Sequence, residues 1–273
     1  MDSTNLPRFE AMTTGVLLDR AFRLYTSNFS LMLGITAAAY VPFYLIMVII
    51  ESRVGINVQA PSGGLSTVLF QIVFMILWAS IAFPIASGAA TYAISERYLG
   101  NEVTIGEALR LALSRFWTLS IAQITATIRV MFGLLLIVPG ILWMLSYALI
   151  VPAVLIEGQN ATPSLRRSRD LVKGHRGKVF CVMFIVNLLQ GILALGVSMV
   201  SGMIFSSDSA GGAVLNSAMN NLLSIFLTPL GIVATILLYY DMRIRKEGFD
   251  LEMLSRAITP NAESVAAVPT PSR

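Results

Sequence analysis

The stretch that decides the fold is Val179-Phe-Cys-Val-Met-Phe-Ile-Val-Asn-Leu-Leu-Gln-Gly-Ile-Leu-Ala-Leu-Gly-Val-Ser-Met-Val-Ser-Gly-Met-Ile-Phe205, 27 residues without a charged side chain. A helix needs about 20 consecutive apolar residues to cross a hydrocarbon core about 30 Å thick. The stretch therefore predicts a membrane-spanning helix. Five further runs of this kind lie at positions 31–50, 65–90, 117–138, 141–156 and 213–240.

The composition of the whole chain agrees with a membrane protein. Hydrophobic residues make up 56% of it and charged residues only 12%, and the mean hydropathy is +0.75. A soluble domain of this length carries about twice that share of charge. We therefore expect an all-α, polytopic membrane protein with six transmembrane helices in three hairpins, and Pro139 and Gly140 predict the tight turn of the middle hairpin.

Positive charge sets the expected orientation. When the sides alternate from a cytoplasmic N-terminus, 17 of the 19 Lys and Arg residues fall in cytoplasmic segments. The exceptions are Arg53, in an outside loop, and Arg129, inside the third run. Short cytoplasmic loops are enriched in Lys and Arg, so both termini are expected in the cytoplasm. The pI near 9.4 then indicates attraction to anionic lipid and not binding of nucleic acid.

The cytoplasmic segment ahead of each hairpin predicts an amphipathic helix. Each has a leucine, a small residue three positions later and a large apolar residue seven positions later. These stripes are Leu18, Ala21 and Tyr25; Leu109, Ala112 and Phe116; Leu165, Ser168 and Val172. Because basic residues flank the stripes, we expect three cytoplasmic interfacial helices in the headgroup plane.

The predicted organisation is a leader at 1–12, a six-span membrane domain at 13–256 and a disordered tail at 257–273. The membrane domain divides into repeat-like units at 13–99, 103–157 and 161–247, although a chance likeness among amphipathic helices stays open. Prolines interrupt four of the spans, and we expect neighbouring helices to satisfy the carbonyls that they free. They are Pro42, Pro84, Pro152 and Pro229.

Arg129 is the charge that most needs a partner. At about 1.5 Å per residue from the start of its run, it would lie about 18 Å into the membrane. A charge at that depth should face the protein interior or water. Gln190 and Asn187 have matching predicted depths in the fifth run. We therefore expect a polar intramembrane cluster of Arg129, Asn187 and Gln190, which could be purely structural or could hold a ligand.

A second candidate site is a basic segment between the fourth and fifth runs. Its cationic side chains are expected to contact anionic lipid headgroups, at about 1 kcal/mol each near the surface. They are Arg166, Arg167, Arg169, Lys173, Arg176 and Lys178.

The sequence offers little for catalysis. His175 is the only histidine and Cys181 the only cysteine, so a zinc site of the usual His and Cys ligands cannot be assembled. Carboxylates at span ends, such as Glu157 and Asp241, stand beside arginines and are expected to be their charge partners. We therefore predict no enzymatic activity, no metal and no cofactor.

Several segments together resemble the bacterial glycerophosphoryl diester phosphodiesterase membrane domain family. They are Leu18-Asp-Arg-Ala-Phe-Arg-Leu-Tyr25, Leu134-Leu-Leu-Ile-Val-Pro-Gly140, Val151-Pro-Ala-Val-Leu-Ile-Glu-Gly158, Leu165-Arg-Arg-Ser168 with Leu171-Val-Lys-Gly174, and Leu238-Tyr-Tyr-Asp-Met-Arg-Ile-Arg-Lys-Glu-Gly248. The resemblance implies a six-span domain of the bacterial inner membrane, sometimes fused to a phosphodiesterase. The catalytic domain of that enzyme opens with His-Arg-Gly. His175-Arg176-Gly177 is judged coincidental, because an apolar span follows it and the other catalytic residues are missing.

Two functions remain open at this point. The favoured one is a non-enzymatic scaffold or accessory factor in envelope or lipid homeostasis, with anionic membrane lipids as partners. The alternative is a transporter or channel for a small anionic or lipid-like ligand, with its site near Arg129 and the fifth and sixth spans. A water-accessible cavity that reaches Arg129 would favour the transporter. A protein partner or a homo-oligomer is possible in either case.

Overall fold

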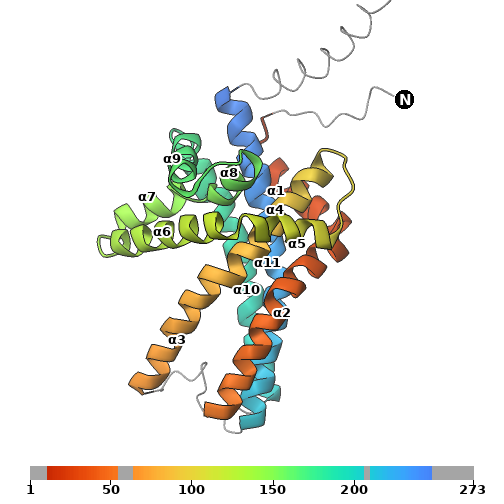
Figure 1. Cartoon of the computed structure of the whole chain (residues 1–273), viewed down its shortest axis with the longest axis vertical. Coiled ribbons are helices and arrows are strands. Elements are labelled where there is room, and N and C mark those ends of the chain that lie inside the picture. The colour runs from red at the N-terminus through yellow and green to blue at the C-terminus, as the bar shows by residue number, and fades with distance from the viewer. Residues whose placement is uncertain (1–10, 55–63, 206–209, 248–273) are drawn as a thin grey trace, which may run out of the picture.

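The computed structural model describes residues 11–54, 64–205 and 210–247, and every regular element in these ranges is helical (Figure 1). The elements are α1 (Thr14–Ser27), α2 (Phe29–Val54), α3 (Leu65–Leu77), the π-helical turn η1 (Trp78–Ala82), α4 (Phe83–Tyr98), α5 (Ile105–Ser114), α6 (Phe116–Leu134), α7 (Val138–Ser146), α8 (Ile150–Ile156), α9 (Ala161–Val172), α10 (Arg176–Ile204) and α11 (Ala210–Glu247). The predicted tail and most of the predicted leader lie outside the described residues.

Five helical stretches are long and apolar enough to cross a membrane, by length and composition. They are Phe29–Ile50, Thr67–Tyr98, Val138–Ile156, Arg176–Ile204 and Val214–Glu247. The all-α prediction is therefore confirmed for the described part of the chain, whereas six spans are not. The missing span is α6, which runs across the direction of α2, α3, α10 and α11 (Figure 1).

The turn of the middle hairpin lies earlier than expected. The chain reverses at 135–137, between α6 and α7, and Pro139 and Gly140 belong to the first turn of α7. Proline suits this position because its missing N–H has no partner in the first turn of a helix. Ile137 has a φ of 53°, in the left-handed region, so the reversal depends on this residue and not on a glycine.

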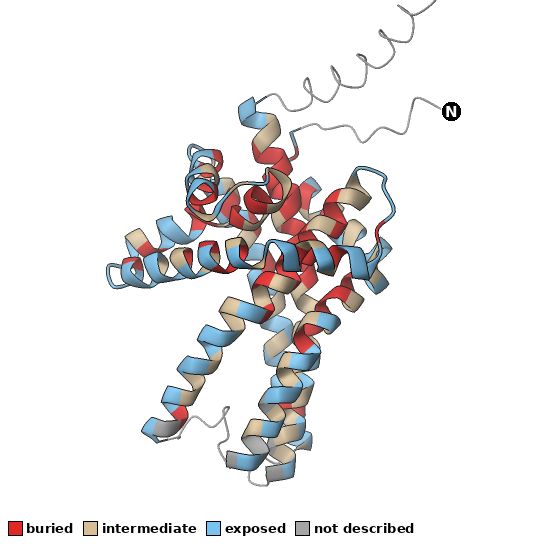
Figure 2. Ribbon diagram, in the orientation of Figure 1, coloured by how far each residue is buried: buried red, intermediate tan, exposed pale blue. Residues whose placement is uncertain are grey.

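Burial is concentrated at one end of the molecule (Figure 2). There α1, α5, α8 and α9 pack around α4 and the C-terminal part of α11. The opposite ends of the long helices expose large hydrophobic side chains, such as Leu69, Val73 and Ile76 on α3. Exposed apolar surface on this scale fits contact with lipid and not with water.

The three amphipathic helices form where they were predicted, as α1, α5 and α9. Thr104 caps α5: its hydroxyl accepts the Glu107 N–H, and the Glu107 carboxylate accepts the Thr104 N–H. These hydrogen bonds hold the pKa of Glu107 below its ordinary value. The apolar stripes of α1, α5 and α9 pack against the rest of the protein. Stripe residues such as Ala21, Ala112 and Leu165 are buried against the protein, because α4, α8 and α11 offer apolar partners there.

Pro84 shows how the fold tolerates a break in a long helix. A proline removes the hydrogen bond to the carbonyl four residues earlier, which is that of Ser80. The Ser120 hydroxyl on α6 donates to this carbonyl at 2.7 Å. The π-helical turn η1 directly precedes the proline. The bond therefore joins α6 to the long helix where the proline interrupts its hydrogen bonding.

Pro229 in α11 is accommodated in the same way. The carbonyl that it frees belongs to Ile225 and accepts the Thr36 hydroxyl of α2 at 3.1 Å. The next carbonyl, of Phe226, accepts the Tyr25 hydroxyl of α1 at 2.8 Å. The expectation that neighbouring helices satisfy such carbonyls is confirmed for Pro84 and Pro229.

A buried carboxylate joins the two ends of the described chain. Asp241 of α11 is fully buried and accepts the Met12 backbone N–H at 2.7 Å. Its other oxygen pairs with Lys178 of α10 at 2.5 Å and with Arg245 at 3.0 Å. Both cations also donate to the Met12 carbonyl. One carboxylate therefore holds the N-terminal segment, the start of α10 and the end of α11 together.

Replacing Asp241 with Asn should destabilise the protein by roughly 3–5 kcal/mol, because Lys178 and Arg245 would lose the charge that compensates their desolvation. Thermal unfolding in detergent measures the loss. Asp19→Asn is the matched control, since Asp19 pairs with Arg23 at the surface with most of both side chains exposed. It should cost less than about 1 kcal/mol. Equal losses for the two variants would contradict the structural role of Asp241.

Candidate functional site

Tyr147, between α7 and α8, organises the first candidate site. Its hydroxyl oxygen accepts hydrogen bonds from Arg129 of α6 at 3.2 Å and from Arg169 of α9 at 3.1 Å. Both guanidinium carbons also lie 6.0 Å from the centre of the tyrosine ring, within the range of a cation–π contact. Two arginines from different helices thus converge on one neutral side chain.

A cavity of about 370 Å³ lies over this pair of arginines. Arg166 of α9 also lines it, together with Thr162, Leu165 and Trp143. We call Arg129, Arg166, Arg169, Thr162 and Tyr147 the arginine site. Its three guanidinium groups make no salt bridge with any Asp or Glu of the described residues. The site therefore holds uncompensated positive charge, which attracts an anion.

The structure does not form the predicted cluster of Arg129 with Gln190 and Asn187. Gln190 donates to the Leu227 carbonyl of α11 at 2.8 Å, and Asn187 donates to the Met183 carbonyl of its own helix at 2.7 Å. The prediction paired these side chains by converting residue number into membrane depth. That conversion requires a helix along the membrane normal, whereas α6 lies across the other helices (Figure 1).

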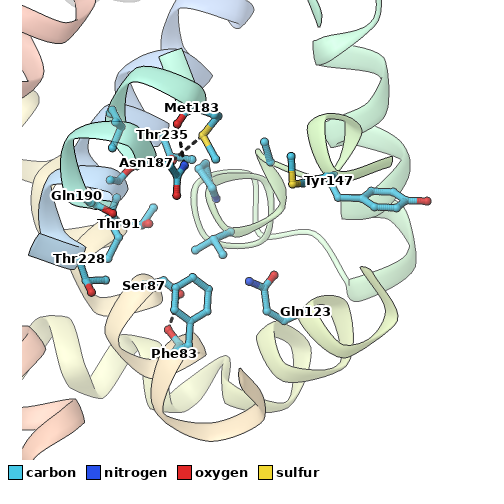
Figure 3. Close-up of a pocket in the computed structure, with 18 of the residues that line it drawn as sticks. Phe83, Ser87, Thr91, Gln123, Tyr147, Met183, Asn187, Gln190, Thr228 and Thr235 are labelled. Carbon is cyan, nitrogen blue, oxygen red and sulfur yellow. Dashed lines mark hydrogen bonds between the residues drawn. The ribbon is translucent and has the colours of Figure 1, made fainter. Parts of the chain in front are cut away.

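The second candidate site is a central cavity of about 430 Å³ between α4, α6, α8, α10 and α11. Its volume falls within the roughly 300–1,000 Å³ that is typical of small-molecule sites. Figure 3 shows Asn187 and Gln190 on one side of it and Gln123 on another, while the Tyr147 hydroxyl points away. Among the described residues, no Asp, Glu, Lys, Arg or His lines the cavity, and its polar lining includes the hydroxyl and amide groups of Ser87, Thr91, Gln123, Asn187, Gln190, Thr228 and Thr235.

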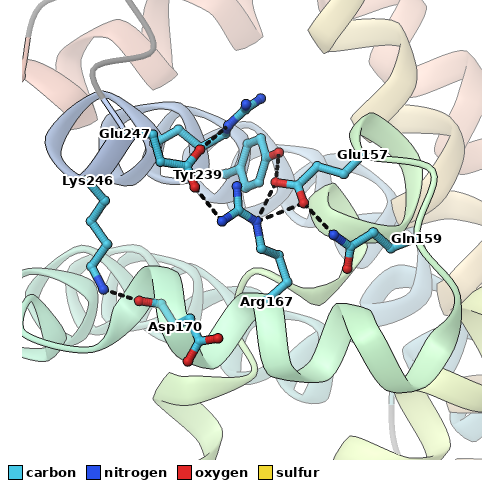
Figure 4. A network of polar contacts seen from close by, with 8 residues as sticks. Glu157, Gln159, Arg167, Asp170, Tyr239, Lys246 and Glu247 are labelled. Carbon is cyan, nitrogen blue, oxygen red and sulfur yellow. Dashed lines mark hydrogen bonds and ion pairs between the residues drawn. The ribbon is translucent and has the colours of Figure 1, made fainter.

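The predicted basic segment does not act as one surface. Arg167 pairs with Glu157 at 2.8 Å and also with Glu247 of α11 (Figure 4). The Tyr239 hydroxyl donates to the same Glu157 carboxylate at 2.8 Å. Lys178 is likewise engaged with Asp241. These two cations connect helices, so they are not available to lipid in the way that was expected.

The four remaining cations of the segment have different surroundings. Arg166 and Arg169 line the arginine site, Lys173 is exposed, and the Nε atom of Arg176 is buried without a hydrogen-bond partner. The period of the helix explains this division. Positions 162, 166 and 169 share one face of α9, whereas 167 lies on another. That spacing could have identified the arginine site from the sequence, although Tyr147 gave no signal within its apolar run.

In comparisons with known proteins, the chain matches no family model, no curated protein and no solved structure. His175 and Arg176, from the tripeptide judged coincidental, lie at the start of α10. Within the described ranges, no three His, Cys, Asp or Glu side chains gather in an arrangement that could hold a metal ion. The arginine site and the central cavity are therefore the features of the structure that bear on function.

The two amide side chains of α10 should differ in their effect on stability. Gln190→Leu removes a hydrogen bond between α10 and α11 and leaves the Leu227 carbonyl without that donor, at a cost of about 1 kcal/mol. Asn187→Leu is the matched control, because Asn187 bonds only within its own helix and its side chain is exposed. Thermal unfolding in detergent compares the two variants. A larger loss for Asn187→Leu would contradict this assignment.

Proposed function

We propose that this chain is a multi-pass protein of the bacterial inner membrane that binds the headgroups of anionic lipids at the arginine site. It would act without catalysis, as a scaffold or accessory factor in envelope or lipid homeostasis. The observation that carries the proposal is the convergence of Arg129, Arg166 and Arg169 without a carboxylate partner.

The chemistry of these groups favours a phosphate. A guanidinium group offers donors in a planar fork that matches two oxygens of a phosphate or carboxylate. The Tyr147 hydroxyl oxygen accepts a hydrogen bond from Arg129 and another from Arg169, so it holds the two guanidinium groups near one another. The Thr162 hydroxyl lines the same cavity and could complete the set of donors. A lipid phosphate would thus meet two or three cations at a prearranged position.

The membrane assignment rests on the long apolar helices and on the distribution of charge. The end of the molecule that buries α1, α5 and α9 also carries most of its Lys and Arg residues. With this end in the cytoplasm, the arginine site faces the leaflet that is rich in anionic lipid. The resemblance to the glycerophosphoryl diester phosphodiesterase membrane domain family would imply the same membrane.

A transporter or channel is the second candidate, and the central cavity favours it. The cavity differs from the predicted transport site, because its lining is uncharged and Arg129 takes no part in it. A ligand carried there would therefore be uncharged, with hydrogen-bonding groups that suit the amides of Asn187 and Gln123. The uncompensated charge of the arginine site makes lipid binding the better-supported function.

The double variant Arg129→Gln with Arg169→Gln should bind phosphatidylglycerol about thirtyfold more weakly. Each arginine near an anionic surface is worth about 1 kcal/mol, and 1.4 kcal/mol corresponds to a factor of ten. Native mass spectrometry of lipid retention measures the change, and Arg110→Gln, on the exposed face of α5, is the matched control. Phosphatidylcholine, whose choline group offsets the charge of its phosphate, should lose less affinity than phosphatidylglycerol in the double variant.

Glycerol phosphate in place of the lipid distinguishes a headgroup site from a site for a soluble phosphate. Weak binding of glycerol phosphate, far below that of phosphatidylglycerol, is expected for a lipid site. Unchanged retention of phosphatidylglycerol by the double variant would overturn the proposed function.

A further inference from the structure

Helix α6 has an apolar stripe that no other part of the described chain covers. Its side chains recur at intervals of four and three residues, which places them on one face of the helix. They are Trp117, Ile121, Ile124, Ile128, Met131 and Leu135, and each is between 38% and 79% exposed. The opposite face, with Leu119, Ala122 and Ala126, is buried against the protein.

The stripe continues into the reversal between α6 and α7. Five consecutive aliphatic residues at 134–138 are 49–79% exposed. The two helices approach closely there, since a Cβ atom on Gly140 would lie 2.5 Å from the backbone nitrogen of Leu134. The hairpin is therefore a compact unit with a wholly apolar tip, and Figure 1 shows it projecting sideways from the long helices.

The hydrogen bond between Ser120 and Ser80 indicates how deep this hairpin lies. Ser80 follows Leu65, the first residue of α3, by 15 positions, or about 22 Å of helix. With Leu65 at the outer edge of a hydrocarbon core about 30 Å thick, and α3 along the membrane normal, α6 would cross the long helix in the inner leaflet. A helix that runs sideways from this point does not reach the other surface.

Both ends of the hairpin connect to helices at the end of the molecule where burial is concentrated (Figure 2). Helix α5, which precedes α6, packs on α4, and α9, which follows α8, packs on α6, α8 and α11. Arg129 lies one residue after Ile128 of the stripe and belongs to the arginine site. Helix α6 thus carries a headgroup-seeking charge beside an apolar face, as helices in the membrane plane do.

We propose that α6 and α7 form a hairpin in the plane of the cytoplasmic leaflet, with the stripe among lipid acyl chains and Arg129 at the headgroups. The proposal rests on the membrane orientation given under the proposed function. The chain then crosses the bilayer four times, through α2, the continuous α3–α4 segment, α10 and α11. Because the hairpin replaces two crossings, both termini stay on the cytoplasmic side.

The test places a single cysteine at the tip of the hairpin in the full chain. Cys181→Ser removes the native thiol, and Leu136→Cys introduces the new one at a side chain that is 73% exposed. The protein is reconstituted in vesicles of phosphatidylethanolamine and phosphatidylglycerol. A membrane-impermeant maleimide is then added to each side in turn, and a nitroxide on the same cysteine reports depth by its collisions with oxygen and with a nickel chelate.

Two control positions calibrate the experiment. Arg110→Cys on α5 and Gly211→Cys at the start of α11 should react from opposite sides. Leu136→Cys should not react with the maleimide from either side, because the tip lies among acyl chains. Its nitroxide should report a depth within the inner leaflet. Phe132→Cys, 67% exposed on the same hairpin, is a second variant that should behave alike.

Two results would overturn the proposal. Reaction of Leu136→Cys from the side that labels Gly211→Cys means that the hairpin crosses the membrane, as the six-span scheme requires. Reaction from the side that labels Arg110→Cys means that the tip lies in water. This test is independent of the test of lipid binding. A hairpin at this depth would shield the Leu136→Cys thiol from the maleimide whether or not the arginine site retains phosphatidylglycerol.

Discussion

The requirement that every backbone carbonyl within the membrane find a hydrogen-bond donor governs how this fold is assembled. Lipid offers no donor, so a proline in a long helix needs one from the protein. Ser120 supplies it at the break before Pro84, and Thr36 supplies it at the break before Pro229. Gln190 donates to a third carbonyl in the same region of α11. The polar side chains of these apolar helices are thus placed where the backbone needs them.

The sequence predicted the elements that depend on local patterns and missed the arrangement that depends on long-range contacts. The apolar runs predicted most of the long helices, and the period of the stripes predicted α1, α5 and α9 near their observed positions. Local patterns suffice for these elements, because they depend on the helix itself. The direction of α6 depends instead on contacts with distant parts of the chain, such as the bond from Ser120 to a carbonyl 40 positions earlier. No local pattern contains such contacts, so the sequence did not reveal the hydrogen bond of Arg129 with Tyr147.

For the candidate sites too, the sequence identified individual residues but not the partners that they contact. Arg129 was correctly singled out as a charge in apolar surroundings, but its partner is a phenol and not an amide. Gln190, chosen as that partner, joins two helices instead. The two features that remain, the arginine site and the central cavity, differ in charge and meet at Tyr147, whose ring lines both. A lipid headgroup in the arginine site and a neutral molecule in the central cavity would therefore both contact Tyr147.

The bond between Met12 and Asp241 has a consequence for how the protein is made. The two residues are 229 positions apart, so their contact cannot form until the chain has left the ribosome past residue 241. Until then Lys178, already inserted at the start of α10, lacks the carboxylate that it pairs with in the finished protein. A chain terminated before Asp241 would keep this cation unpaired, so an incomplete product would differ from the finished protein by an uncompensated charge at the start of α10.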